Sequence, residues 1–200
     1  NVANWRLQHQ IRGQAGDPVK IIDVKNPKPG EPKKVVRAYK LFRQKKNQPG
    51  KLFPLFIGSN KETPVGRWEG AEHISTKGFA ERSGWHVGVK PDASHLMKAD
   101  GTMADDRVWA QVLIPADQDW QSVASASKTE DIRGQIPEGG FYRFPRPAHQ
   151  GGEWRIAGAI KVEKILTPKE VAKANETINA PVGARGLLAG NPKFLASGEG

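Results

Sequence analysis

The stretch RVWAQVLIP at residues 107–115 constrains the fold of this chain more than any other segment. Polar and apolar side chains alternate along it, β-branched residues are frequent, and Pro115 ends it. This period of two is typical of a β-strand, whereas an amphipathic helix repeats its apolar residues at about every 3.6 positions. We therefore expect a domain that is organised around at least one well-formed strand.

Other runs with strand character lie on both sides of this segment. The runs at 35–42 and 51–58 are joined by a polar turn with Pro49-Gly50 and predict a hairpin, in which Pro54 indicates an edge or a bulge. Two more strand-like runs occupy 139–146 and 153–166. A helix is predicted to start after Thr167, because a threonine cap, a proline at the first position and a glutamate at the third are typical of helix starts.

These elements predict an α+β fold of small, twisted, mostly antiparallel sheets with few short helices. Two hundred residues with a 37% hydrophobic share allow one core of modest size. We expect a basic, proline-rich arm at 1–34, a compact domain at 35–179 and a tail rich in Gly, Ala and Pro at 180–200. No run of residues is apolar enough for a membrane span or a secretion signal, so no membrane partner is expected.

Positive charge is concentrated near the start of the chain. The net charge is +10, and thirteen of the 31 Lys and Arg residues but only three of the 21 Asp and Glu residues lie before position 52. Such a segment attracts a polyanion such as nucleic acid, an anionic surface or a phosphate-rich ligand, although it can also be a solvated arm that keeps the protein in solution. The residues expected to contact a polyanion are Lys33, Lys34, Arg37, Lys45 and Lys46.

The residue types exclude several common kinds of catalytic site. Without cysteine the chain has no disulfide, no thiolate nucleophile and no cysteine-bound zinc. No two of the five histidines have the spacing that places both on one helix face, so no metal is predicted. No serine lies in a GxSxG motif, and no glycine-rich phosphate loop is present.

One segment, GWHVGVKPDASHL at 84–96, resembles the motif GxYFxxxPxxAxxY of the ADP-ribosyltransferase-like fold. Gly84 and Pro91 match the glycine and proline of the motif, Ala93 corresponds to its alanine but stands one position early, and His86 stands at its tyrosine. Two more patches follow the same order as in that family. AYKLFR resembles the first strand of the fold, which ends in a basic residue, and GGEWRIAGAIKVEKIL resembles the strand that carries the catalytic glutamate.

The resemblance implies NAD as the substrate and a role for particular residues. Glu153 takes the position of the catalytic carboxylate, and Arg43 takes the position of the residue that holds the phosphates of NAD. The other residues expected at the cofactor are Gly84, Trp85, His86 and Gly88, with Trp85 or His86 covering the nicotinamide ring. The alternative for Glu153 is a carboxylate at an exposed strand end, and for His86 a turn histidine that donates to a backbone carbonyl.

The sequence thus leads to two hypotheses from different classes. The first is a domain that transfers ADP-ribose from NAD to a macromolecule, in the cytoplasm or in a virion, as part of a larger phage or mobile-element protein or as a toxin-like module. The second is a non-enzymatic module that binds nucleic acid or serves as a structural part of a phage-type assembly. Binding that weakens steeply with salt would favour the second.

Overall fold

The computed structural model of the chain describes residues 20–55, 59–71, 84–93, 96–126, 136–144 and 153–179. Nine strands form one continuous sheet in this part of the chain, with the order β3-β9-β5-β2-β4-β8-β7-β6 and with β1 paired to β2. Every pair is antiparallel except β6 and β7. The fold is therefore mostly sheet with few short helices. The strands are β1 Ile21–Asp23, β2 Lys34–Arg43, β3 Trp68–Gly70, β4 Trp85–Gly88, β5 Arg107–Pro115, β6 Gln118–Asp119, β7 Gly140–Phe144, β8 Trp154–Ala157 and β9 Ala159–Ile165.

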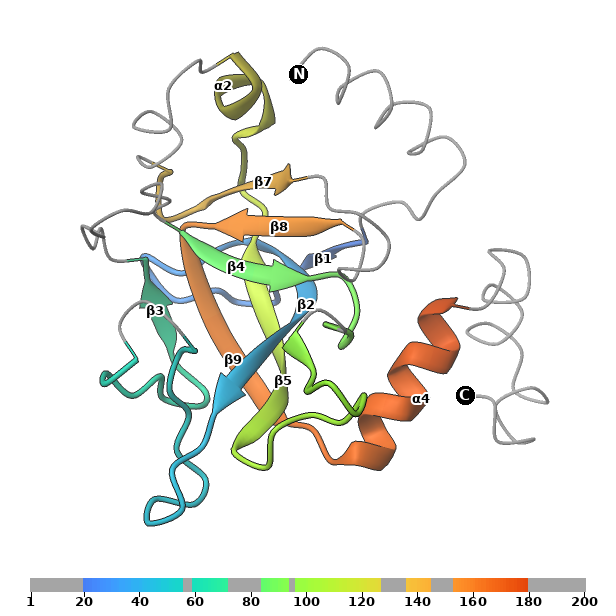
Figure 1. Ribbon diagram of the computed structural model, residues 1–200. Coiled ribbons are helices and arrows are strands. Elements are labelled where there is room, and N and C mark those ends of the chain that lie inside the picture. Colours follow the sequence, from blue (N-terminus) through green and yellow to red (C-terminus); the bar gives the residue numbers. More distant parts are fainter. Residues whose placement is uncertain are drawn as a thin grey trace, which may run out of the picture.

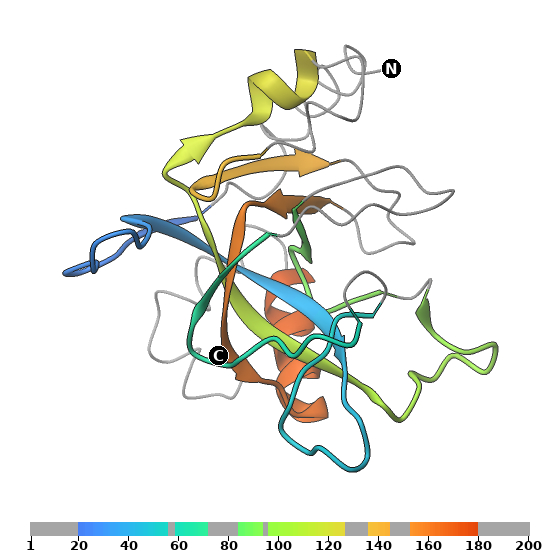
Figure 2. The same ribbon diagram turned by 90° about the vertical axis from the view of Figure 1, so that its left-hand side faces the viewer.

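The sheet is bent into two layers that cross each other (Figure 1). One layer contains β9, β5 and β2, and the other contains β4, β8 and β7, which run across the first layer in both Figure 1 and Figure 2. Crossed layers of this kind are typical of orthogonal sheet packing, in which one strand turns a corner and passes from one layer to the other. Here β8 and β9 form that corner, and only Gly158 separates them.

The central pair of the first layer is β2 with β5. They pair in register over nine positions, from Val35 opposite Pro115 to Arg43 opposite Arg107. The strand predicted at 107–115 is confirmed with the same bounds. The predicted hairpin of β2 is shorter than expected, because among the described residues 51–55 only Phe53 bridges to β2, at Arg43, and Leu52 bridges to Thr63 instead. Pro54 lacks the amide hydrogen that a continued ladder would need.

The core lies between the two layers. Buried side chains from β2, β5 and β9 meet buried side chains from β4, β7 and β8 in one cluster. Its largest fully buried members include Phe42, Leu52, Ile114 and Ile160. Burying apolar surface at about 25 cal/mol per Å² is the main favourable term in such a fold, so the two layers stabilise each other.

The described chain begins with a strand that extends the sheet and ends with a helix. Ile21 to Asp23 pair with Val36 to Lys34, so the chain joins the sheet well before residue 35, where the compact domain is predicted to begin. At the other end, helix α4 (Pro168–Asn179) begins at the predicted residue. The Glu170 amide donates to Thr167 Oγ1 at 3.2 Å, and the Thr167 amide donates to Glu170 Oε1 at 3.1 Å, which together form a capping box. A second, short helix, α2 (Gln121–Ala126), lies beside β7.

Candidate functional site

Strand β4 carries the glycine-aromatic motif and lies between β2 and β8. Gly88 pairs with Tyr39 on one side and with Trp154 on the other. Glu153 directly precedes Trp154, so the fold brings it next to the motif although about 65 residues of sequence separate them. Of the residues predicted at the cofactor, Trp85, His86 and Gly88 therefore lie on the strand paired with β8, and Gly88 is the nearest of them to Glu153. Gly84 directly precedes this strand, at the end away from Glu153.

Gly84 is required by the backbone at the start of β4. Its φ angle is +119°, and a Cβ atom there would lie 2.5 Å from Cγ2 of Ile156. A side chain at this position would both strain the backbone and push β8 away from β4. The glycine of the motif thus maintains the close approach of the two strands that carry the candidate residues.

Alternation along β4 separates its two aromatic residues. The ring of His86 lies 6.3 Å from that of Trp154 at a tilt of 56°, so these two side chains share one face of the layer. Trp85 packs against the core cluster with Val87 on the other face, and its indole Nε1 donates to the backbone oxygen of Glu69 at 3.1 Å. A ligand on one face can therefore contact Trp85 or His86, but not both rings.

Glu153 lies on the Trp85 side of β8. Its carboxylate Oε2 is 3.6 Å from Nη2 of Arg155, two residues further on, and residues two apart on a strand share a face. The Glu153 side chain is 20% exposed and that of Arg155 only 8%. Arg155 is a functional candidate that the sequence reading missed, although an arginine inside the apolar run WRIAGAI is a signal that could have found it.

A second missed residue, Lys40, lies behind the motif. Its ammonium Nζ donates to the backbone oxygen of His86 at 2.9 Å and lies 5.8 Å from the centre of the Trp85 ring and 5.7 Å from that of Phe42. Burial of the ammonium lowers the pKa of Lys40 from 10.5 to about 8. Its place between the buried residues Ala38 and Phe42, on the core-facing side of β2, was visible in the alternation.

The lowered pKa of Lys40 predicts how stability changes with pH. At a pH below the folded-state pKa of about 8, Lys40 is protonated in both the folded and the unfolded state, and the folded state bears the full free-energy cost of burying the charged ammonium. Above this pKa only the unfolded state stays protonated, so the free energy of unfolding should rise, by about 2 kcal/mol up to about pH 9.5. Urea unfolding at a series of pH values measures this rise. The Lys40→Met variant should lack it, and an equal rise in that variant would contradict the assignment.

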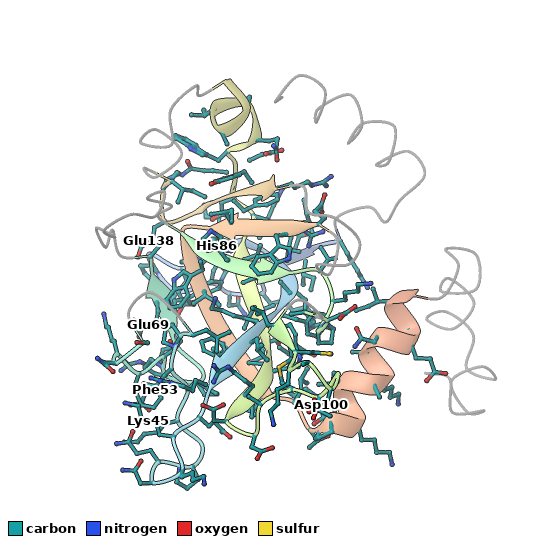
Figure 3. The ribbon with its side chains drawn as sticks, in the orientation of Figure 1. Lys45, Phe53, Glu69, His86, Asp100 and Glu138 are labelled. Carbon is teal, nitrogen blue, oxygen red and sulfur yellow. The ribbon has the colours of Figure 1, made fainter. Side chains whose placement is uncertain are left out.

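Arg43 does not lie with the other predicted residues. It ends β2, whereas β2 pairs with β4 at Tyr39, opposite Gly88 at the Glu153 end of β4, and the bridge partner of Arg43 is Phe53. Arg43 is four residues further along β2 than Tyr39, or about 13 Å at 3.3 Å per residue. The Arg43 Nη2 donates to the backbone oxygen of Ser59 at 2.9 Å. In Figure 3, Phe53, the bridge partner of Arg43, lies well below His86.

The five residues predicted to contact a polyanion do not form one patch. Lys33, Lys34 and Arg37 lie at the start of β2, and Lys45 and Lys46 follow its end, about 30 Å away at 3.3 Å per residue. Arg37 is paired with Glu163, whose Oε1 lies 3.0 Å from its Nε. The Lys33 and Lys34 amides both donate to the Asp117 carboxylate. Most of the predicted basic arm lies outside the described residues.

Two further observations concern kinds of site that the described segments lack. No group of three His, Asp or Glu residues in these segments is placed to hold a metal ion. Of the five histidines only His86 is described, and His9, His73, His95 and His149 lie outside. Among the described residues, neither helix is long and apolar enough to cross a membrane.

Comparison with known proteins identifies no relative of this chain. The chain matches no family model, no curated protein and no solved structure.

Proposed function

We propose that this chain is an ADP-ribosyltransferase-like domain that cleaves the bond between nicotinamide and ribose in NAD and transfers ADP-ribose to a macromolecule. The observation that carries the proposal is the pairing of β4 with β8, which sets Glu153 beside the strand of the glycine-aromatic motif. The sequence resemblance requires these two patches to meet, and they are about 65 residues apart along the chain.

Glu153 has the chemistry that this reaction needs. As the nicotinamide–ribose bond breaks, nicotinamide leaves with the bonding electron pair and positive charge develops on the ribose. A carboxylate beside the ribose stabilises that charge, as in glycoside cleavage. The acceptor then forms a bond to the ribose carbon and loses its proton to solvent or to a nearby base.

The alternation of β4 favours Trp85 over His86 as the residue that covers the nicotinamide ring. Trp85 lies on the same face as Glu153, and its position on β4 is four residues along from that of Glu153, about 13 Å at 3.3 Å per residue. The ammonium of Lys40, 5.8 Å from the Trp85 ring, adds positive charge on this side, where the phosphates of NAD would need it.

Release of nicotinamide is the experiment that tests the proposal. The full chain is incubated with NAD labelled in its nicotinamide, with water as the acceptor, and free label is measured over time. We expect release above the rate without protein. No release, together with double-stranded DNA binding that falls by 1,000-fold or more between about 50 and 200 mM salt, would instead favour the non-enzymatic nucleic-acid-binding module.

A further inference from the structure

Two arginines face each other at the end of the β2–β5 ladder. Arg43 and Arg107 are the last pair of this register. Directly opposed residues of antiparallel strands carry their side chains on the same face, about 5 Å apart at Cβ, where like charges repel each other. Two opposed arginines are stable in a fold when negative groups or hydrogen-bond acceptors nearby offset their repulsion.

The described neighbours compensate them only in part. Nη1 of Arg107 lies 2.8 Å from Oδ1 of Asp106, yet its hydrogens are not directed at that oxygen, and this buried nitrogen has no hydrogen-bond acceptor. The buried Nε of Arg43 also has none, although Nη2 of the same residue is held by Ser59. A buried donor without an acceptor is costly, and each arginine of the pair carries one, which indicates that the described residues do not supply every acceptor that the pair needs.

A third cation lies near the pair. Lys45 follows Arg43 by two residues, and its Nζ lies 4.1 Å from the centre of the Phe53 ring, which Figure 3 shows close to it. Phe53 is the bridge partner of Arg43 on the side away from Arg107. Three positive side chains thus lie at this end of the ladder, and the Asp106 carboxylate is paired with one of them, Arg107. The Arg107 side chain is 28% exposed, so a solute can reach its exposed part. The buried Nη1 of Arg107 and Nε of Arg43 become accessible when these two side chains move.

We infer that Arg43 and Arg107 together bind a phosphate group, with Lys45 adding to its attraction. Guanidinium groups are planar forks whose N–H bonds match the oxygens of a phosphate, and two of them can hold a diphosphate from both sides. The site takes a phosphate monoester or diphosphate, such as that of a nucleotide. It does not depend on Glu153 or on the cleavage of NAD, so it stands or falls by itself.

Calorimetric titration of the full chain with inorganic pyrophosphate at low salt tests this site. We expect saturable binding, and at least a tenfold loss of affinity in Arg107→Gln and in Arg43→Gln. Arg67→Gln is the matched control, since Arg67 is an exposed arginine beside Glu69, and its affinity should equal that of the unmodified chain. ADP and adenosine form two further arms. ADP that binds more tightly than pyrophosphate while adenosine does not bind identifies a nucleotide, whereas equal affinities identify the phosphate groups alone.

Several outcomes separate this inference from the proposed function. Pyrophosphate binding that persists in Glu153→Gln, with or without nicotinamide release, supports a separate phosphate site. If Arg43→Gln fails to fold because the bond to Ser59 is lost, Arg107→Gln still decides the question. Absence of pyrophosphate binding, or an equal loss of affinity in Arg67→Gln and Arg107→Gln, would overturn the inference.

Discussion

Replacing Glu153 by glutamine is expected to lower nicotinamide release from NAD by at least about 100-fold. Glutamine keeps the size and shape of the side chain but lacks the negative charge that stabilises the developing ribosyl cation. The affinity for NAD should change much less, because the lost interaction strengthens only as the bond breaks. The measurement is the rate of release of labelled nicotinamide at saturating NAD, with the dissociation constant of NAD determined separately by calorimetry.

The control for this experiment is Glu176→Gln. Glu176 lies on the exposed side of α4 and undergoes the same chemical change, so its release rate should equal that of the unmodified chain. Circular dichroism spectra of both variants verify that the fold is retained, which matters because Arg155 loses a charged neighbour in Glu153→Gln. An unchanged rate in Glu153→Gln would refute the catalytic assignment, and an equal loss in both variants would show that the effect is not specific to this residue.

Short sequence patterns correctly predicted the strands and helices that are specified by residues close together in the sequence. The alternation at 107–115 and the cap at Thr167 both predicted their elements at the observed starts. The alternation of a half-buried strand and the cap of a helix are both contained in a few consecutive residues. Contacts with the rest of the fold therefore rarely change these elements.

The partners of the strands could not be predicted in the same way. The sequence placed the run at 51–58 beside β2, since adjacent runs joined by a turn usually form a hairpin, but β5 pairs with β2 over nine positions. Pairing between distant strands depends on how the two layers close around a shared core, and no short window of sequence contains that information.

The candidate site illustrates the same limit. The order of the patches predicted that Glu153 would meet the motif, and the pairing of β4 with β8 brings them together. Arg43 was assigned to the same site, yet it lies at the other end of its strand, where Arg107 is its neighbour. Lys40 and Arg155 were overlooked because charged residues in apolar runs were counted only as part of the total charge.

Replacing Gly158 by alanine is expected to be the most destabilising single-methyl change in the described fold. Gly158 forms the corner between β8 and β9, and a Cβ atom there would overlap the backbone oxygen of Pro137 and come within 2.9 Å of the Glu138 Cα. The backbone is fixed on both sides, because the Gly158 amide donates to the Gly140 oxygen at 3.0 Å and its own oxygen accepts from the Ala71 amide at 2.8 Å. We expect a loss of at least about 3 kcal/mol in the free energy of unfolding.

Gly50→Ala separates this steric effect from the general cost of removing a glycine. Gly50 has a φ of +81° and nothing within 4 Å of its virtual Cβ, so alanine there bears only the left-handed backbone penalty, about 1 kcal/mol. Urea unfolding of the two variants gives the comparison directly. Gly158 joins the layer of β9 to the layer of β8. If Gly158→Ala lowers the free energy of unfolding no more than Gly50→Ala does, the corner can move to accept a methyl group. In that case the corner does not fix the register of β8 that brings Glu153 to the motif.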